Sequence, residues 1–211
     1  MLIKPAARAN KKGAYTVDFW PLMLVLSAAA LIPACSRQNQ SPADTLTIGT
    51  GSPITTLNPL YASDAGSQHT TELVHAALVS SNPQFLPEPY LAKSFRVVAP
   101  TILEFSLREG CRFHTGRPIT ADDVARSLAY FQDARNQSSF AETYRRVVRF
   151  EKLSNLSFRL HTDKPAPSLL SDLEILKILD LDGLLPGAKP ASIPGAGPYA
   201  LVSANASLVE L

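Results

Sequence analysis

The segment 91–131 constrains the fold of this chain more than any other part of the sequence. Apolar and polar residues alternate through residues 102–107, which is the period-two pattern of a half-buried β-strand. Ala99-Pro100 interrupts the extended run before this strand, so the two strands are predicted to pair as a hairpin. Glu109-Gly110 and the run TGRP at 115–118 then predict two turns.

A helix is predicted to follow the second of these turns. Thr120 is a suitable N-cap residue, and Asp123 three residues later completes the pattern of a capping box. Asp122 and Asp123 also place negative charge at the positive end of the helix dipole. One apolar face of the helix is predicted from residues at helical spacing, namely Val124, Leu128 and Phe131.

The order and spacing of these residues resemble the signature of family 5 extracellular solute-binding proteins, the peptide-binding components of ABC importers. The matching runs are LA at 91–92, FSLREG at 105–110, FHTG at 113–116 and PITADDV at 118–124. Thr115 departs from the pattern, because the family usually has aspartate there. Two other runs, TLNP at 56–59 and GAGPY at 195–199, are similar to further family elements.

The resemblance implies an α/β fold, namely a periplasmic-binding-protein-like lobe of type II with a small extra subdomain around residues 80–180. Residues 44–211 then correspond to the N-terminal part of the family 5 domain, and the chain is expected to be truncated before the second lobe. Proteins of this kind close two lobes around their ligand. One alternative keeps the family without transport activity: a single-lobe lipoprotein that is an interaction module or a non-functional fragment.

The N-terminus has the pattern of a targeting segment. Four basic residues precede an apolar stretch at 22–32, which is shorter than the ~20 residues that span a bilayer and typical of a signal peptide. Ala34-Cys35 resembles a bacterial lipoprotein processing site, so we predict a signal peptide over 1–34, a lipid on Cys35 and a flexible polar tether over 35–43. This places the protein in the periplasm or cell envelope, anchored to a membrane. Ordinary secretion with cleavage nearby is the alternative.

The positive formal charge of the chain belongs to this leader. Four basic residues against Asp18 give residues 1–34 a charge of +3, so the whole-chain +2 becomes −1 without them. A near-neutral surface has no electrostatic footprint for nucleic acid. Cys111 is predicted to be a small buried core residue beside the hairpin. A Cys35–Cys111 disulfide is the alternative, and it requires that Cys35 carries no lipid.

The rest of the chain predicts an alternation of short strands and helices. Residues 45–50 and 199–202 are predicted strands, and 147–153 with 156–162 are predicted to form a second hairpin. Helices are predicted at 64–78 and 168–179, where apolar residues recur near helical spacing.

The sequence contains no motif that indicates catalysis or a cofactor, so we expect that the protein is not an enzyme. Gly195-x-Gly197 is not expected to bind phosphate, because Pro198 and an extended run follow where a helix N-terminus is required. The carboxylate pairs Asp122/Asp123 and Asp180/Asp182 are attributed to helix capping and solvation.

The histidines do not predict a metal site either. His69, Glu72 and His75 lie three residues apart, whereas zinc-protease helices place two histidines four residues apart. We interpret them as part of a partly exposed helix face. His114 belongs to the second turn of the 91–131 segment, where a side-chain bond to the backbone is predicted.

An exposed extended segment can bind a peptide, because the peptide main chain pairs with it as an added strand. By resemblance, the ligand cleft is lined by Ser63, Asp64 and Ala65. Asp64 would receive a ligand ammonium, cap the following helix, or both. Phe140 and Tyr144 correspond to cleft-facing aromatics, with core packing as the alternative. The implied partners are a peptide or similar small solute, an ABC permease with its ATPase, and the membrane through the lipid.

Overall fold

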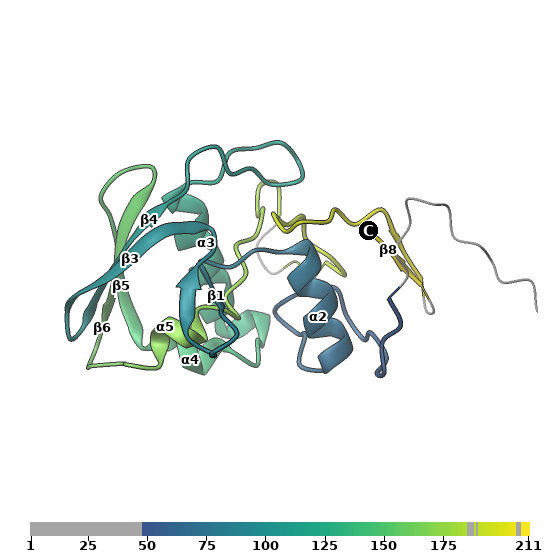
Figure 1. Cartoon of the computed structure of the whole chain (residues 1–211), viewed down its shortest axis with the longest axis horizontal. Helices are drawn as coiled ribbons and strands as arrows, with labels where there is room; N and C mark the ends of the chain where they lie inside the picture. The colour runs from purple at the N-terminus through teal and green to yellow at the C-terminus, as the bar shows by residue number, and fades with distance from the viewer. Residues whose placement is uncertain (1–47, 185–187, 189, 206–207) are drawn as a thin grey trace, which may run out of the picture. The chain divides into compact units, whose positions relative to one another are not determined.

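The computed structural model describes residues 48–184, 188, 190–205 and 208–211 (Figure 1). The predicted signal peptide, Cys35 and the tether lie outside the described residues. The predicted strand at 45–50 lies partly outside them, and its described part, 48–50, is not a strand, so that part of the prediction is wrong.

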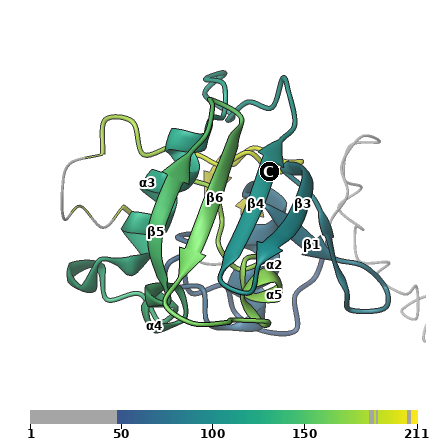
Figure 2. The same cartoon turned by 90° about the vertical axis from the view of Figure 1, so that its left-hand side faces the viewer.

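Two hairpins build a four-stranded antiparallel sheet (Figure 2). Strand β3 (Ala92–Ala99) pairs with β4 (Ile102–Leu107), and β5 (Val147–Lys152) pairs with β6 (Ser157–Thr162). Strands β4 and β6 pair at the centre, which gives the order β3-β4-β6-β5. Both predicted hairpins are therefore confirmed.

Four phenylalanine rings, one from each strand, cross the face of this sheet that packs on helix α3 (Ala121–Gln132). The ring centroids are 6.1 Å apart for Phe95 and Phe105, 5.3 Å for Phe105 and Phe158, and 4.8 Å for Phe158 and Phe150. Aromatic pairs at such distances contribute roughly 0.5–1.5 kcal/mol beyond the burial of their area. Phe105 and Phe158 are fully buried in the hydrophobic core, and Phe95 and Phe150 pack against it at the outer strands.

The opposite face of the sheet carries a row of charged side chains in register across the strands. Arg96 contacts Glu104 at 2.6 Å, Glu104 contacts Arg159 at 2.8 Å, and Arg159 lies 3.9 Å from Glu151. The four residues are direct cross-strand neighbours. The arginine side chains of these pairs are partly or largely exposed to solvent. Each pair therefore contributes little to stability.

Helix α3 begins as the sequence predicts. The backbone N–H of Thr120 donates to Asp123 Oδ2 at 2.8 Å, and the predicted capping box is present. Val124, Leu128 and Phe131 are buried on one face. The turns before the helix contain Gly110 and Gly116 at φ +78° and +85°, a backbone conformation that favours glycine. The 3-10 helix η2 (Ala134–Asn136) and helix α4 (Ala141–Arg145) follow.

Helix α2 (Ala65–Val74) is shorter than the predicted 64–78. The helix ends at Val74, with His75 as its C-cap, because the carbonyl groups of the next residues accept hydrogen bonds from other segments. The carbonyl of Ala76 accepts from Ile178 N–H at 2.9 Å, and those of Ala77 and Leu78 accept from the segment 90–92. The chain then forms the short antiparallel pair β1 (Val79–Ser81) and β2 (Pro87–Pro89).

Helix α5 (Leu169–Asp172) is also shorter than predicted, since 168–179 was expected to be helical. Leu176, Ile178 and Leu179 are fully buried in a non-helical segment. The N–H of Leu179 donates to Ser127 Oγ of α3 at 2.9 Å. The apolar residues whose spacing predicts a helix are therefore buried in an irregular segment that bonds to α3 and to the residues that follow α2.

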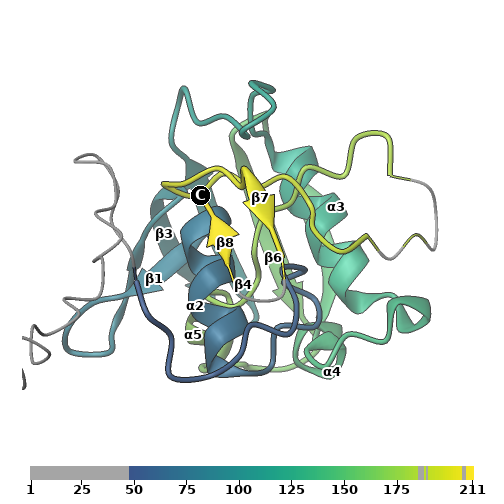
Figure 3. The same cartoon turned by 90° about the vertical axis from the view of Figure 1, so that its right-hand side faces the viewer.

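The GAGPY run lies flat against the C-terminal end of α2. Gly197 N–H donates to Val74 O at 2.8 Å, and Tyr199 N–H donates to Leu73 O at 3.1 Å. The predicted strand at 199–202 is wrong: Tyr199 pairs with the helix end, and only Val202 N–H reaches β8, donating to Glu210 O at 2.9 Å. Strand pairing starts only at β7 (Ser203–Ala204), which pairs with β8 (Val209–Glu210) (Figure 3).

Candidate ligand-binding site

A cleft of about 500 Å³ opens beside the N-terminal loop of the described chain. One wall is the continuous segment 50–57, which precedes α2. The opposite wall consists of residues around the β7–β8 turn and in the Pro/Gly-rich loop, namely Ala191, Ala204, Asn205, Leu208 and Val209. The described residues that line the cleft include hydroxyl and aliphatic side chains and no ionisable one.

The first turn of α2 fixes the shape of the 50–57 wall. Asp64 Oδ1 accepts from the backbone N–H of Ser67 at 2.8 Å, and Asp64 Oδ2 accepts from Thr55 Oγ1 at 2.5 Å. Ser67 Oγ in turn accepts from the backbone N–H groups of Thr55 and Thr56 at 2.9 and 3.1 Å. Two side chains of one helical turn therefore hold two consecutive residues of the cleft wall.

Hydrogen bonding also sets the charge of Asp64. The bond from Thr55, followed by the bonds from Ser67, lowers the pKa of Asp64 to about 2. Because these bonds stabilise the ionised form, they persist as pH falls and are lost only near pH 2. The carboxylate is therefore ionised and engaged at neutral pH.

Close packing adds a second constraint on the wall. A Cβ atom at Gly66 would lie 2.7 Å from the carbonyl oxygen of Pro53, so the helix approaches the loop as closely as only glycine permits. Beyond the wall, Asn58 Oδ1 accepts from Leu60 N–H at 3.1 Å, a side-chain bond that forms a turn. Its amide also donates to Pro190 O at 2.9 Å.

The predicted site residues fall into two groups. Ser63 and Ala65 are exposed and flank Asp64, which is the N-cap of α2, so the capping alternative is confirmed. Phe140 is half-buried and packs against the core. Tyr144 is fully buried, and its hydroxyl donates to Asp172 O at 2.9 Å. Tyr144 thus follows the core-packing alternative, and neither aromatic lines this cleft.

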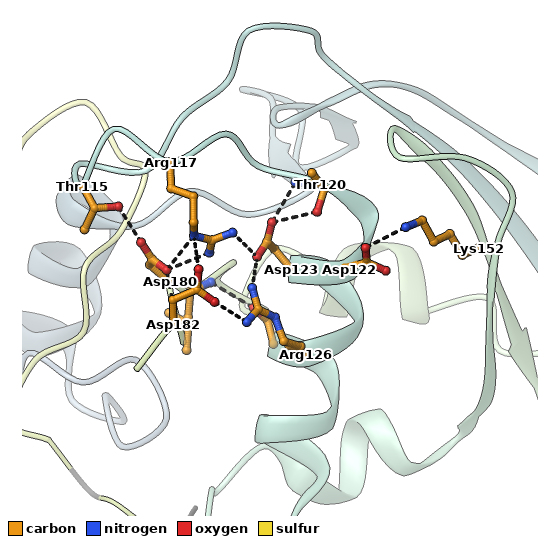
Figure 4. Close-up of polar contacts among 11 residues, drawn as sticks. Thr115, Arg117, Thr120, Asp122, Asp123, Arg126, Lys152, Asp180 and Asp182 are labelled. Atoms are coloured by element: carbon orange, nitrogen blue, oxygen red, sulfur yellow. Dashed lines mark hydrogen bonds and ion pairs between the residues drawn. The ribbon is translucent and has the colours of Figure 1, made fainter. Parts of the chain in front are cut away.

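An ionic cluster around the buried carboxylates of Asp123 and Asp180 lies at the junction of the second turn, α3 and the segment 180–182 (Figure 4). Arg117 contacts Asp123, Asp180 and Asp182 at 2.8, 2.7 and 2.7 Å. Arg126 contacts Asp123 and Asp182, each at 2.5 Å. Asp180 is buried in this cluster, so its attribution to solvation is wrong, whereas Asp182 is both paired and exposed. Asp123, attributed to capping, also belongs to this cluster.

Electrostatics explains why these carboxylates stay ionised. Burial alone would raise the pKa of Asp123, but hydrogen bonds from Arg117, Thr120 and Arg126 outweigh it and lower the pKa. The same balance, with Arg117 and Thr115 as donors, lowers the pKa of Asp180. Thr115 Oγ1 donates to Asp180 at 2.5 Å, so the residue that departs from the family pattern takes part in the cluster.

The histidines have structural contacts. His114 Nε2 lies 3.0 Å from Gly197 O, which confirms the predicted side-chain bond to backbone. His75 is buried between the carbonyls of Thr71 and Ile193, and burial lowers its pKa to about 4. His69 is exposed. Within the described residues, no group of three metal-ligating side chains comes together. The helices of the described part of the chain are also too short or too polar to cross a membrane. Cys111 is only half-buried, at the edge of the core.

The fold and its cleft define the class of protein, an α/β lobe of the periplasmic-binding-protein type. The family model for "Bacterial extracellular solute-binding proteins, family 5 Middle" matches residues 87–211, and the chain belongs to this family. Among solved structures, NikZ from Campylobacter jejuni in complex with Ni(L-His) is similar, with 27% identity and a TM-score of 0.69. That similarity covers 78% of this chain and 34% of NikZ.

Two curated relatives are similar over about three quarters of the chain. The HTH-type transcriptional regulator SgrR of Pectobacterium atrosepticum is 29% identical over 161 residues, 75% of this chain. The probable peptide-binding protein YejA of Agrobacterium fabrum is 28% identical over 178 residues, 76% of this chain. In both cases the chain spans only 28% of the relative's length.

Proposed function

We propose that this lobe binds a peptide or a related small solute in the cleft beside residues 50–57, without converting it chemically. In this proposal the protein acts outside the cytoplasmic membrane and delivers the solute to an ABC permease driven by its ATPase. The observation that supports it is a preformed wall of hydroxyl and aliphatic side chains on a family 5 lobe. The name of YejA, a probable peptide-binding protein, supports a peptide, and the complex of NikZ with Ni(L-His) supports a related small solute.

Ser63 and Ala65 belong to the proposed site as exposed neighbours of the residue that holds the wall. Phe140 remains a predicted contact, which a ligand would reach only outside the cleft described above. We further propose a lipid on Cys35 that anchors the protein to the cell envelope.

Binding is tested by thermal unfolding of the full chain with and without trialanine. A ligand at a hundred times its Kd stabilises a protein by about 2.7 kcal/mol, so we expect the midpoint to rise by several degrees. Gly51 lines the cleft, and a Cβ atom added there would meet no other atom within 4 Å. Gly51→Trp should therefore abolish the rise. Gly49→Trp is the matched control, because Gly49 has equal space and lies outside the lining. An equal rise in both variants would exclude this cleft.

The lipid anchor is tested by the intact mass of the native product extracted from membranes with detergent. We expect a polypeptide that begins at Cys35 and carries the mass of a diacylglyceryl group. A product with an unmodified N-terminus, released without detergent, would contradict the anchor and leave the binding proposal in place.

A further inference from the structure

The N-terminal turn of α2 and the cleft wall form one hydrogen-bonded unit. Both oxygens of the Asp64 carboxylate accept hydrogen bonds from protein groups, one from Ser67 and one from Thr55. A ligand ammonium at Asp64 would have to compete with the bond from Thr55, which is the shorter of the two. Asp64 therefore holds the cleft wall in place from the side of α2.

The wall itself carries no charge that could pair with a charged ligand group. Its side chains are hydroxyls and aliphatics at every described lining position from 50 to 57. The amide groups of Thr55 and Thr56 point away from a ligand, because they donate to Ser67 Oγ. Placing an ammonium or carboxylate against such a surface would cost its hydration without supplying a counter-charge.

We propose that Asp64 is a positioning residue that acts on the ligand through Thr55, and that the ligand segment seated against residues 50–57 is uncharged. A peptide main chain with small side chains has this chemistry. The inference rests on the proposed function for its ligand class. The positioning role stands on the contacts alone.

A ligand-free experiment tests the positioning role. Hydrogen–deuterium exchange of the full chain reports the amides of Thr55 and Thr56, which Ser67 protects. Asp64→Asn should keep their exchange near the wild-type rate, because an asparagine oxygen can accept from Ser67 and its amide can donate to Thr55. Thr55→Val and Ser67→Ala should each accelerate exchange in this segment, about tenfold for the loss of one bond.

A binding experiment with two probes tests the ligand class. Trialanine carries both terminal charges, and N-acetyl-trialanine-amide carries neither. We expect the Kd of the neutral probe for Asp64→Asn to stay within about twofold of wild type. The Kd for Thr55→Val should rise about tenfold, as expected for a lost bond to a charged group.

The two readouts separate the possible failures. Loss of trialanine binding in Asp64→Asn with unchanged exchange would overturn the inference, because Asp64 would then be a counter-charge. Unchanged exchange in Thr55→Val would also overturn it. Exchange that follows the expected pattern, with no binding of either probe to wild type, would support the positioning role and count against peptide binding.

Discussion

Asp123→Ala is expected to lower the free energy of unfolding by roughly 3–5 kcal/mol, the cost of removing one partner of a buried ion pair. Asp123 is fully buried, and one of its oxygens contacts both Arg117 and Arg126. Its other oxygen accepts from the N-cap of α3. The substitution therefore leaves two guanidinium groups short of negative charge and removes the capping box. Urea unfolding measures the loss.

Asp122→Ala is the matched control for this prediction. Asp122 is the neighbouring residue and also pairs with a cation, Lys152 Nζ at 2.6 Å, but its side chain is 61% exposed. An exposed pair contributes about 0–1 kcal/mol, so this variant should unfold at nearly the wild-type urea concentration. If both variants lost the same stability, the cluster would have no special role in holding the second turn to α3.

Gly197→Ala is expected to lower stability by roughly 3 kcal/mol or more, through overpacking of backbone against backbone. The added Cβ would lie 2.4 Å from Leu73 O at the end of α2. Gly195→Ala should be at least as damaging, since its Cβ would lie 2.1 Å from Val74 O. Neither carbonyl can move away without breaking the hydrogen bond that it accepts from the GAGPY run. Thermal unfolding followed by circular dichroism measures the effect.

Gly49→Ala provides the reference for these two variants. A Cβ at Gly49 meets no atom within 4 Å, so this substitution should change stability by no more than about 0.5 kcal/mol. Equal melting midpoints for Gly49→Ala and Gly197→Ala would show that the GAGPY run does not press on α2 in solution.

Local patterns in the sequence were sufficient for the elements whose partners lie nearby in the chain. The two hairpins and the capped helix α3 follow from alternation, turn residues and a four-residue capping motif. They form as predicted because each is stabilised by contacts within a few residues of itself, before tertiary packing is considered.

The predictions that failed concern contacts over long sequence separations. Helical spacing predicts that α2 and α5 continue, but Ala77 and Lys177, which follow the two helices, pair with each other across a hundred positions. The cluster around Arg117 joins residues 63 positions apart, and no local motif announces it. The cleft wall was missed for the same reason. Residues 51–56 carry no pattern of a helix or strand, and only the contacts with Asp64 and Ser67 give this segment a shape.

The two rows of side chains on the sheet have a consequence for how the chain reaches this fold. Neighbouring residues of a strand face opposite sides, so a shift of β4 by one residue would move Glu104 among the phenylalanine rings and Phe105 into solvent. All four strands carry the same alternation, so every one-residue error in pairing meets this penalty at once. A misaligned hairpin would therefore bury charged side chains and expose aromatic rings, which disfavours it against the native register.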